Sequence, residues 1–192
     1  MKSLEIVVVA YKRPIQIQVL IHSLAAQTCQ DFFISIYHDG FDPEILSILT
    51  DLKVMYPDMI NFEFTQGRYN DYGHSLREIG IGKASAEYIL ITNDDNYYCP
   101  TFVSEMLKKL PSNDLVYCDM IHSHTDYKRI FRTYTRLGSI DVGSMIVRTE
   151  LAKKIGWPDK SYSGDGTYCE DLMSSIPNIR VKKIRKVLFV HN

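Results

Sequence analysis

The sequence predicts an α/β protein with a single domain, built on a mainly parallel central sheet with helices on both faces. The first observation is Leu4–Ala10 (LEIVVVA), a continuous β-branched run typical of a strand that is buried on both faces. The second is the alternation that follows, in which short apolar runs and stretches of helical spacing succeed one another up to about residue 100. Strands and helices that alternate in this order form parallel, doubly wound sheets.

Each expected strand is a short apolar run bounded by polar or turn-forming residues. The expected strands are residues 4–10, 32–37, 61–64, 88–92, 115–120, 142–147 and 187–190. Each expected helix has apolar residues at helical spacing. The first two begin directly after Pro14 and at Pro43, and proline is favoured in the first turn of a helix. The expected helices are residues 15–26, 43–55, 75–83, 101–110, 150–154 and 169–175. The polar, aromatic and basic stretch 122–137 is expected to form a small irregular lobe beside the site.

Length and composition fit one compact domain and argue against several classes of protein. The 192 residues are 45% hydrophobic, enough to bury a core without disulfides or metals. With 22 Lys and Arg against 23 Asp and Glu, the net charge of −1 argues against nucleic-acid binding through bulk charge. The four cysteines form no Cys-x-x-Cys pair, which favours reduced thiols in a cytoplasmic protein. No apolar stretch approaches the length of a membrane span or of a signal-peptide core, so we expect a soluble protein with no transmembrane segment.

Basic residues are concentrated in residues 180–186 (RVKKIRK). Such a segment is either a binding surface or an ordinary strand whose basic side chains face water. Its alternation favours the strand, with Val181 and Ile184 pointing inward.

Polar clusters lie at or near the ends of several expected strands. In an open parallel sheet, ligands collect at the carboxyl ends of the strands. The clusters are Tyr11-Lys12-Arg13, His38-Asp39-Gly40, Asn93-Asp94-Asp95-Asn96 and His191-Asn192. Their convergence predicts a ligand site at that edge of the sheet.

Asn93-Asp94-Asp95-Asn96 carries the sharpest chemical signal. Two adjacent carboxylates directly after a buried strand repel each other, and burying them without compensation is costly. A divalent cation resolves that conflict, and oxygen ligands with phosphate partners suit Mg²⁺ or Mn²⁺. Because Asn and Asp also favour turns for purely local reasons, this segment alone leaves both interpretations open.

Other polar residues are ambiguous when each is taken alone. Glu170 and Asp171 are expected to open a helix after the Gly-rich stretch 163–166, where acids would complement the positive end of the helix. A lone histidine such as His191 is more often structural than functional. The absence of Gly-x-Gly-x-x-Gly, of a phosphate-binding Gly-x-x-x-x-Gly-Lys-Ser/Thr loop and of Gly-x-Ser-x-Gly disfavours dehydrogenases, P-loop NTPases and α/β hydrolases.

Taken in order, these residues resemble the family-2 type of GT-A glycosyltransferase, and the resemblance covers nearly the whole chain. Asn93-Asp94-Asp95-Asn96 stands at the family's Asp-x-Asp position and is similar to the variant in spore-coat polysaccharide glycosyltransferase. The Gly…Arg-Asn-x-Gly segment of the family is matched at residues 73–80, with Glu78 in place of the Asn. The nucleotide-binding residues that the resemblance and the strand-end clusters indicate are Ala10, Tyr11, Arg13, Asp39, Arg77, Asn93 and Asp94.

The resemblance also implies roles in metal binding and catalysis. Asp95 and His191 would hold Mn²⁺ or Mg²⁺, and Gly143 with Ser144 looks like the glycine loop beside the donor sugar. Cys169-Glu170-Asp171 matches the x-Glu-Asp motif of the family, in which the Asp is the general base. From its residue type, Trp157 is a second candidate for the donor sugar, although core packing is an equally good interpretation.

The resemblance implies one GT-A (Rossmann-like) catalytic domain over residues 1–192, with a nucleotide-binding half (1–100) and an acceptor-side half (101–192). The implied reaction is a metal-dependent, inverting transfer of a sugar from a nucleoside diphosphate to a hydroxyl of a carbohydrate or glycoconjugate acceptor. The resemblance implies UDP as the preferred nucleotide, because Asp39 matches the acid that hydrogen-bonds the base, commonly uracil, in the family. The chain runs only one residue past His191, so we expect an excised catalytic domain or a minimal member of the family.

Two departures from the family pattern and two alternative functions remain open. Asn93 replaces the usual first acid of Asp-x-Asp, and the helix after Asp171 lacks the basic residue often found there. A nucleotidyltransferase also uses paired acids and a metal, but it normally has a Gly-rich basic loop where this chain has residues 11–14 (YKRP). A catalytically inactive sugar-nucleotide or glycan-binding module is the other alternative, and Glu170 and Asp171 argue against it.

Overall fold

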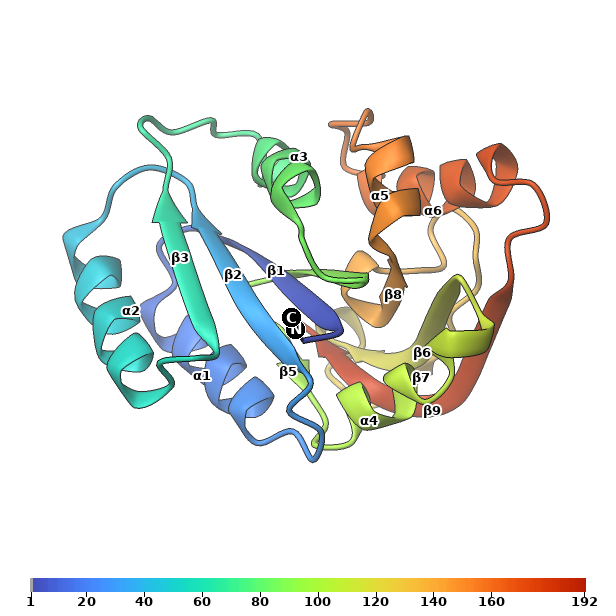
Figure 1. Cartoon of the computed structure of the whole chain (residues 1–192), viewed down its shortest axis with the longest axis horizontal. Coiled ribbons are helices and arrows are strands. Elements are labelled where there is room, and N and C mark those ends of the chain that lie inside the picture. Colours follow the sequence, from blue (N-terminus) through green and yellow to red (C-terminus); the bar gives the residue numbers. More distant parts are fainter. Residues whose placement is uncertain (1) are drawn as a thin grey trace.

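A nine-stranded sheet runs through the whole molecule in the computed structural model, which describes residues 2–192 (Figure 1). The strands are β1 (Leu4–Ala10), β2 (Phe32–His38), β3 (Ile60–Phe64), β4 (Tyr88–Asn93), β5 (Tyr97–Tyr98), β6 (Leu115–His122), β7 (Ile130–Phe131), β8 (Met145–Arg148) and β9 (Val181–His191). Their order across the sheet is β3-β2-β1-β4-β8-β6-β9-β5, with β7 paired to β6. β1 to β4 are mutually parallel, β8 is antiparallel to both of its neighbours, and β9 runs parallel to β6.

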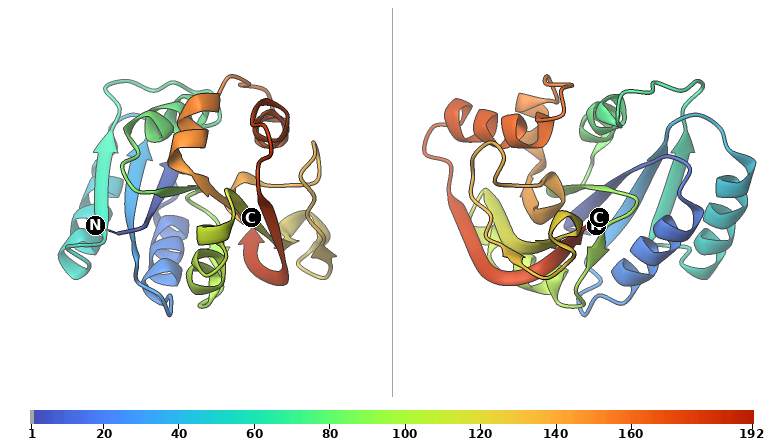
Figure 2. Two further views of the ribbon diagram at one scale, coloured as in Figure 1. Left: turned by 45° about the vertical axis from the view of Figure 1, so that its right-hand side comes forward. Right: turned by 180° about the vertical axis from the view of Figure 1, so that it is seen from behind.

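Helices cover both faces of this sheet, as Figures 1 and 2 show. They are α1 (Pro14–Ala25), α2 (Pro43–Met55), α3 (His74–Lys83), α4 (Phe102–Leu107), α5 (Thr149–Ile155) and α6 (Gly164–Ser175), with 3₁₀ turns η1 (Leu110–Ser112), η2 (Ser123–Thr125) and η3 (Val142–Ser144). The helices α1, α2 and α4 pack on one face, and α3, α5 and α6 pack on the other. The fold class predicted from the sequence is therefore confirmed.

The composition of β1 follows from its place in the middle of the sheet. Successive side chains of a strand point to opposite faces. Leu4, Ile6 and Val8 join the hydrophobic core under α1 and α2, whereas Val7 and Val9 join the core under α3. Because both faces are covered, every position of the strand except Glu5 is apolar, and this is why it was recognisable in the sequence. The buried Glu5 carboxylate accepts hydrogen bonds from the Ser35 hydroxyl and the Ser85 amide, both at 2.7 Å.

The first two helices begin where local chemistry favours a helix start. Pro14 and Pro43 lie in the first turns of α1 and α2, where the missing amide proton costs nothing. Asp42 caps α2, since its carboxylate accepts hydrogen bonds from the backbone amides of Glu44 and Ile45 at 3.0 and 3.1 Å. The bounds of α2 are those predicted from the sequence.

Several elements differ from the prediction: the short strands β5 and β7 were not predicted, α4 ends at Leu107 rather than at residue 110, and three further elements begin elsewhere than expected. The expected strand 142–147 begins with the turn η3 and becomes a strand only at Met145. The last strand starts at Val181 rather than near residue 187, so it includes the basic segment. Ile184 is buried, and Lys183 and Lys186 pair with Asp119 and Glu105 at 2.6 and 2.7 Å, so the strand interpretation of that segment is confirmed.

The third difference concerns α6, which begins at Gly164 and not near Cys169. The Gly-rich stretch 163–166 does not precede the helix but forms its N-cap and first turn. Its glycines are there for close packing, since a Cβ at Gly166 would lie 2.7 Å from Leu137 Cδ1 and one at Gly164 would lie 2.8 Å from the Asp159 carbonyl. Glu170 and Asp171 therefore lie in the middle of α6, and the interpretation of this pair as helix-opening acids is wrong.

None of the helices in the described part of the chain is long and apolar enough to cross a membrane.

The packing of α3 on the sheet gives a test of the fold. A Cβ at Gly80 would lie 2.3 Å from Val7 Cγ1 and 3.3 Å from Tyr37 Cε2, whereas one at Gly82 would meet nothing within 4 Å. We expect Gly80→Ala to destabilise the protein by about 1–3 kcal/mol through overpacking. Gly82→Ala is the matched control in the same helix and should stabilise it by up to about 1 kcal/mol. Urea denaturation of the two variants measures both effects, and equal effects would contradict the close approach of α3 to β1.

Candidate active site

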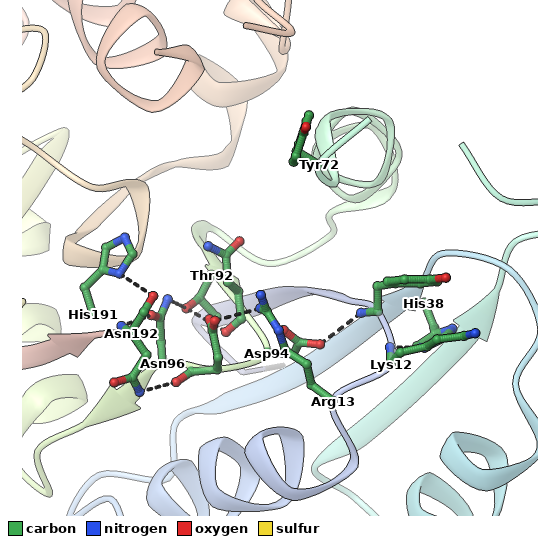
Figure 3. A network of polar contacts seen from close by, with 12 residues as sticks. Lys12, Arg13, His38, Tyr72, Thr92, Asp94, Asn96, His191 and Asn192 are labelled. Atoms are coloured by element: carbon green, nitrogen blue, oxygen red, sulfur yellow. Dashed lines mark hydrogen bonds and ion pairs between the residues drawn. The ribbon is translucent and has the colours of Figure 1, made fainter. Parts of the chain in front are cut away.

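The structure brings the polar clusters that follow β1, β2, β4 and β9 together at one edge of the sheet (Figure 3). The Tyr11 amide donates a hydrogen bond to Asp94 Oδ2 at 2.9 Å, which joins the end of β1 to the end of β4. The Asn192 amide donates to Asn96 Oδ1 at 3.3 Å, and the Asn192 side-chain amide donates to the Asp95 carbonyl. These contacts join the end of β9 to the same turn after β4.

Arg13 lies between the two adjacent carboxylates. Its Nη1 atom is 3.0 Å from Asp94 Oδ1 and 2.7 Å from Asp95 Oδ2. Asp94 is 2% exposed, and this burial raises its pKa to about 6 although the Tyr11 amide and Arg13 both favour the charged form. The positive charge of Arg13 thus offsets part of the repulsion between the Asp94 and Asp95 carboxylates.

Asp95 keeps an oxygen without a protein partner. Its Oδ2 pairs with Arg13, whereas its Oδ1 is buried and accepts no hydrogen bond from any residue that the structure describes. Burial raises the pKa of this carboxyl group, and Arg13 opposes the shift. A buried oxygen of this kind is available to a ligand that supplies positive charge.

Asp39 organises the loop after β3. Its two carboxylate oxygens accept hydrogen bonds from the backbone amides of Tyr69 and Asn70 at 2.7 and 3.0 Å. The Arg68 guanidinium lies 4.0 Å from the centre of the Tyr11 ring, and its Nε is 3.9 Å from Asp39 Oδ2. Tyr11, Asp39 and Arg68 therefore surround one small area at the ends of β1 and β2.

Arg77 connects this loop to β4. Its Nη2 donates to Asn93 Oδ1 at 2.6 Å, and its Nη1 donates to the Tyr72 carbonyl at 2.9 Å. Asn70 and Tyr72 have φ values of 56° and 57°, a left-handed conformation that is unfavourable for both residue types and especially for a tyrosine. Contacts from Asp39 and Arg77 hold the loop in this conformation, in which the Tyr72 side chain is exposed near the site.

His191 reaches the site at the end of β9 and forms an ion pair that was not predicted. Its Nε2 is 2.9 Å from Asp141 Oδ2, and its Nδ1 is 2.8 Å from the Asn192 carbonyl. Burial lowers the pKa of His191, but the hydrogen bond and charge of Asp141 outweigh burial and raise this pKa to about 9. The ring is therefore an imidazolium at neutral pH, and the His122 ring stacks on it at a centroid distance of 4.3 Å.

Asp165, in the first turn of α6, completes the acidic cluster. Its Oδ2 accepts a hydrogen bond at 3.4 Å from the amide of Val142, the residue that follows Asp141. Burial, followed by the charge of Asp141, raises the pKa of Asp165 to about 7. Sequence reasoning missed both acids. The available signal was the spacing of Asp165, Cys169 and Leu172, which is that of one helical face.

The residues predicted to touch the donor sugar are buried. Gly143 and Ser144 pack beneath Asp141: the Gly143 amide donates to Asp141 Oδ1 at 2.7 Å and the Ser144 hydroxyl donates to the Asp141 carbonyl at 2.7 Å. The Trp157 ring is 3% exposed and packs between His74, Tyr168 and Arg77. No ring face is left for a sugar, so the core-packing interpretation of Trp157 holds and its assignment to the donor sugar does not.

Glu170 and Asp171 lie farther along α6. Glu170 is exposed and accepts a hydrogen bond from the Leu137 amide at 2.8 Å. The Asp171 carboxylate, which is half-buried, has no hydrogen bond or ion pair with any residue in 2–192. Six residues of α-helix separate it from Asp165, which corresponds to about 9 Å along the axis and about a third of a turn around it.

The metal site implied by the resemblance fits these residues in part. Among residues 2–192 no group of three or more His, Cys, Asp or Glu side chains is arranged to hold an ion. Mg²⁺, however, is usually held by one or two carboxylates together with substrate phosphates, and the unpartnered Asp95 Oδ1 suits that kind of site. His191 fits less well, because both of its ring nitrogens already donate hydrogen bonds.

Known proteins share this sequence pattern and this fold. The family model "Glycosyl transferase family 2" matches residues 5–170. YwdF of Bacillus subtilis (strain 168), described as an uncharacterized glycosyltransferase, is 27% identical over 121 residues, which are 61% of this chain and 41% of YwdF. An uncharacterized glycosyltransferase of Rickettsia bellii (strain RML369-C) is 27% identical over 128 residues, which are 65% of this chain and 16% of that protein. The chain thus spans less than half the length of these relatives.

Solved structures agree in fold. S. aureus TarS 1–349 in complex with UDP has a TM-score of 0.79 and 18% identity, over all of this chain and 61% of TarS 1–349. The mannosyltransferase PcManGT of Pyrobaculum calidifontis, solved with GDP-Man and Mn²⁺, has a TM-score of 0.78 and 15% identity, over 98% of this chain and 56% of PcManGT. At 18% and 15% identity, these similarities show a shared fold and nothing further. Because the family model covers most of its residues, this chain belongs to glycosyl transferase family 2.

Proposed function

We propose that this protein transfers a sugar from a UDP-sugar to a hydroxyl group of a carbohydrate or glycoconjugate acceptor. The observation that carries the proposal is the convergence of Asp39, Asp94 and Asp95 at one edge of the sheet, together with Tyr11 and Arg13. Membership of glycosyl transferase family 2 supports it, as does a fold shared with TarS, which has been solved with UDP and with UDP-GlcNAc.

In this proposal the nucleotide lies across the ends of β1, β2 and β4. The uracil packs on the Tyr11 ring and is hydrogen-bonded by Asp39, and Ala10 leaves room for it at the strand end. Asp94 holds the ribose. Arg77 and Arg13 place positive charge beside the diphosphate. Hydrogen bonds between a guanidinium and a phosphate are stronger than those between neutral groups.

The proposed metal ligands are Asp95, through its unpartnered Oδ1, and His191. A bound Mn²⁺ or Mg²⁺ would stabilise the negative charge that develops on the leaving diphosphate. His191 would bind a metal only through an Nε2 that has lost its proton, and its ion pair with Asp141 favours the protonated ring. Asp95 is therefore the more important ligand in this proposal.

Transfer is proposed to be a single displacement that inverts the anomeric carbon. The acceptor oxygen attacks this carbon as the bond to UDP breaks, and a carboxylate of α6 removes the proton of the acceptor hydroxyl. The sequence motif names Asp171 for this step, with Glu170 beside it. An inactive sugar-nucleotide-binding module would bind the donor equally well but would show no turnover.

The first prediction concerns the metal. UDP should raise the melting temperature far more in Mn²⁺ than in a chelator, because the metal ties the diphosphate to Asp95. A ligand at a hundred times its Kd stabilises the native state by about 2.7 kcal/mol. Asp95→Ala should remove the difference between Mn²⁺ and chelator.

Asp126→Ala is the matched control, since that carboxylate is exposed and, within residues 2–192, pairs only with Lys128 at 3.3 Å. It should leave the Mn²⁺ dependence unchanged. Equal shifts with UDP in Mn²⁺ and in chelator for the unaltered protein would disprove the metal assignment.

The second prediction concerns the nucleobase. Asp39→Asn replaces one carboxylate oxygen by an NH₂ group, which must face the amide of Tyr69 or Asn70, or the uracil. Loss of one charge-assisted hydrogen bond costs about 1.5 kcal/mol or more, so UDP should bind roughly tenfold more weakly. Titration calorimetry with UDP and CDP measures the loss and any change in preference.

Asp42→Asn is the control for this substitution. Asp42 caps α2 three residues away, and Asn is an equally good cap. Its UDP affinity should match that of the unaltered protein. If Asp39→Asn binds UDP normally as well, Asp39 does not contact the base.

A further inference from the structure

Residues 122–137 form a lobe at the edge of the molecule to which the proposed sugar transfer gives no role. The lobe contains η2 and β7, and it protrudes from the rest of the chain (Figure 2). Four Lys and Arg residues and one Asp lie within it, in a chain whose net charge is −1. Positive charge is therefore concentrated on this one protruding segment.

Most of the charge of the lobe is not neutralised within the protein. Two exposed carboxylates adjoin it: Asp126 pairs with Lys128 at 3.3 Å, and Glu170 accepts a hydrogen bond from the Leu137 amide at 2.8 Å. The arginines of the lobe are exposed and form no ion pair with any residue in 2–192; they are Arg129, Arg132 and Arg136. Elsewhere in the chain, arginines lie within 3.1 Å of a carboxylate at Arg13, Arg148 and Arg180. Cations that the fold leaves without counter-ions attract an anionic partner.

Apolar side chains are exposed on the same lobe. Successive side chains of an extended segment point to opposite faces. Phe131 and Thr133 point inward, whereas Ile130, Arg132 and Tyr134 are exposed together. The Ile130 side chain is 63% exposed although it lies in a strand. An aliphatic, a cationic and an aromatic side chain thus share one outward face.

This mixture of side chains identifies the class of partner. The centre of the Tyr134 ring is 5.4 Å from the Arg136 guanidinium and 4.8 Å from the Lys183 ammonium, and Leu137 is 48% exposed. Protein surfaces that bind anionic membranes combine basic residues, which meet the lipid phosphates, with apolar residues, which enter the headgroup region. A soluble polyanion would use the arginines but would gain nothing from Ile130 and Leu137.

We propose that the lobe docks the protein on an anionic membrane surface. Its arginines lie against the lipid phosphates, and its exposed aliphatic side chains enter the headgroup region. The lobe also adjoins the edge of the sheet that carries the candidate active site, since the Tyr127 hydroxyl donates a hydrogen bond at 2.5 Å to Asn192 Oδ1, just past the end of β9. Docking through the lobe therefore brings that edge close to the membrane.

The experiment sediments the full chain with vesicles of phosphatidylcholine and with vesicles of an equal mixture of phosphatidylcholine and phosphatidylglycerol. We expect binding to the mixed vesicles only, and weaker binding as salt shortens the Debye length from about 10 Å at 0.1 M to about 3 Å at 1 M. Each basic residue near an anionic surface strengthens binding roughly fivefold. The double substitution Arg129→Gln and Arg132→Gln should therefore lower the partition coefficient by roughly tenfold or more.

The matched control is the double substitution Lys153→Gln and Lys154→Gln in α5. It removes the same charge from two exposed residues outside the lobe and should bind the mixed vesicles as the unaltered protein does. Melting temperatures of both double variants verify that the fold is intact. The salt dependence of the unaltered protein tests the charge contribution without any substitution.

Ile130→Ser separates a membrane from a soluble polyanion. It should weaken binding to the mixed vesicles roughly fivefold, because an apolar side chain no longer leaves water, and it should leave binding to inorganic polyphosphate unchanged. Failure of the unaltered protein to bind mixed vesicles overturns the proposal, as does equal binding by the arginine variant and the lysine control. Normal vesicle binding by Ile130→Ser, or binding of polyphosphate alone, gives the lobe to a soluble polyanion instead. UDP affinity and turnover of UDP-sugars in solution test the proposed function separately.

Discussion

The site depends on how negative charge is balanced at one edge of the sheet. Asp94, Asp95, Asp141 and Asp165 all lie there, and a buried carboxylate without a partner is among the most costly features that a fold can contain. Arg13 lies between the first two acids, and the His191 imidazolium pairs with the third. The fourth acid, Asp165, accepts a hydrogen bond from the Val142 amide. The conformation of the segment after β1, the path of β9 and the position of α6 all follow from these pairings.

Much of the fold was predictable because its signals are local. The mostly apolar strand β1 is specified by a few adjacent residues, and so is α2, with a proline in its first turn and an aspartate as its cap. The first half of the site was predictable for the same reason, since Asp94 and Asp95 follow a strand directly. Asp141 and Asp165 were not, because their roles come from partners on other elements. Asp165 in addition stands between two glycines, which indicate a loop in sequence and here allow α6 to pack closely.

Trp157 illustrates the limit of reasoning from residue type. A single tryptophan near a presumed sugar site is a natural candidate for stacking. Its environment is instead set by Tyr168 on α6 and by His74 on α3, which is 83 residues away in the sequence and accepts a hydrogen bond of 2.9 Å from the Trp157 Nε1 atom at its Nδ1. No local pattern contains this information. The burial of an aromatic ring is a property of the assembled structure, and the same holds for the acceptor side of the site as a whole.

The position of β9 has a consequence for how the protein is made. β1 to β4 pair with one another and are complete once residue 93 has been synthesised, whereas β9 pairs with β6 across more than sixty residues, Leu115 lying opposite Val181. On the ribosome, at about 5–20 residues per second, the acidic edge of the sheet therefore exists for several seconds before the cation of His191 arrives. A chain interrupted before β9 would have Asp141 without its counter-ion. Such a chain would hold a buried carboxylate without its charged partner, which is strongly destabilising.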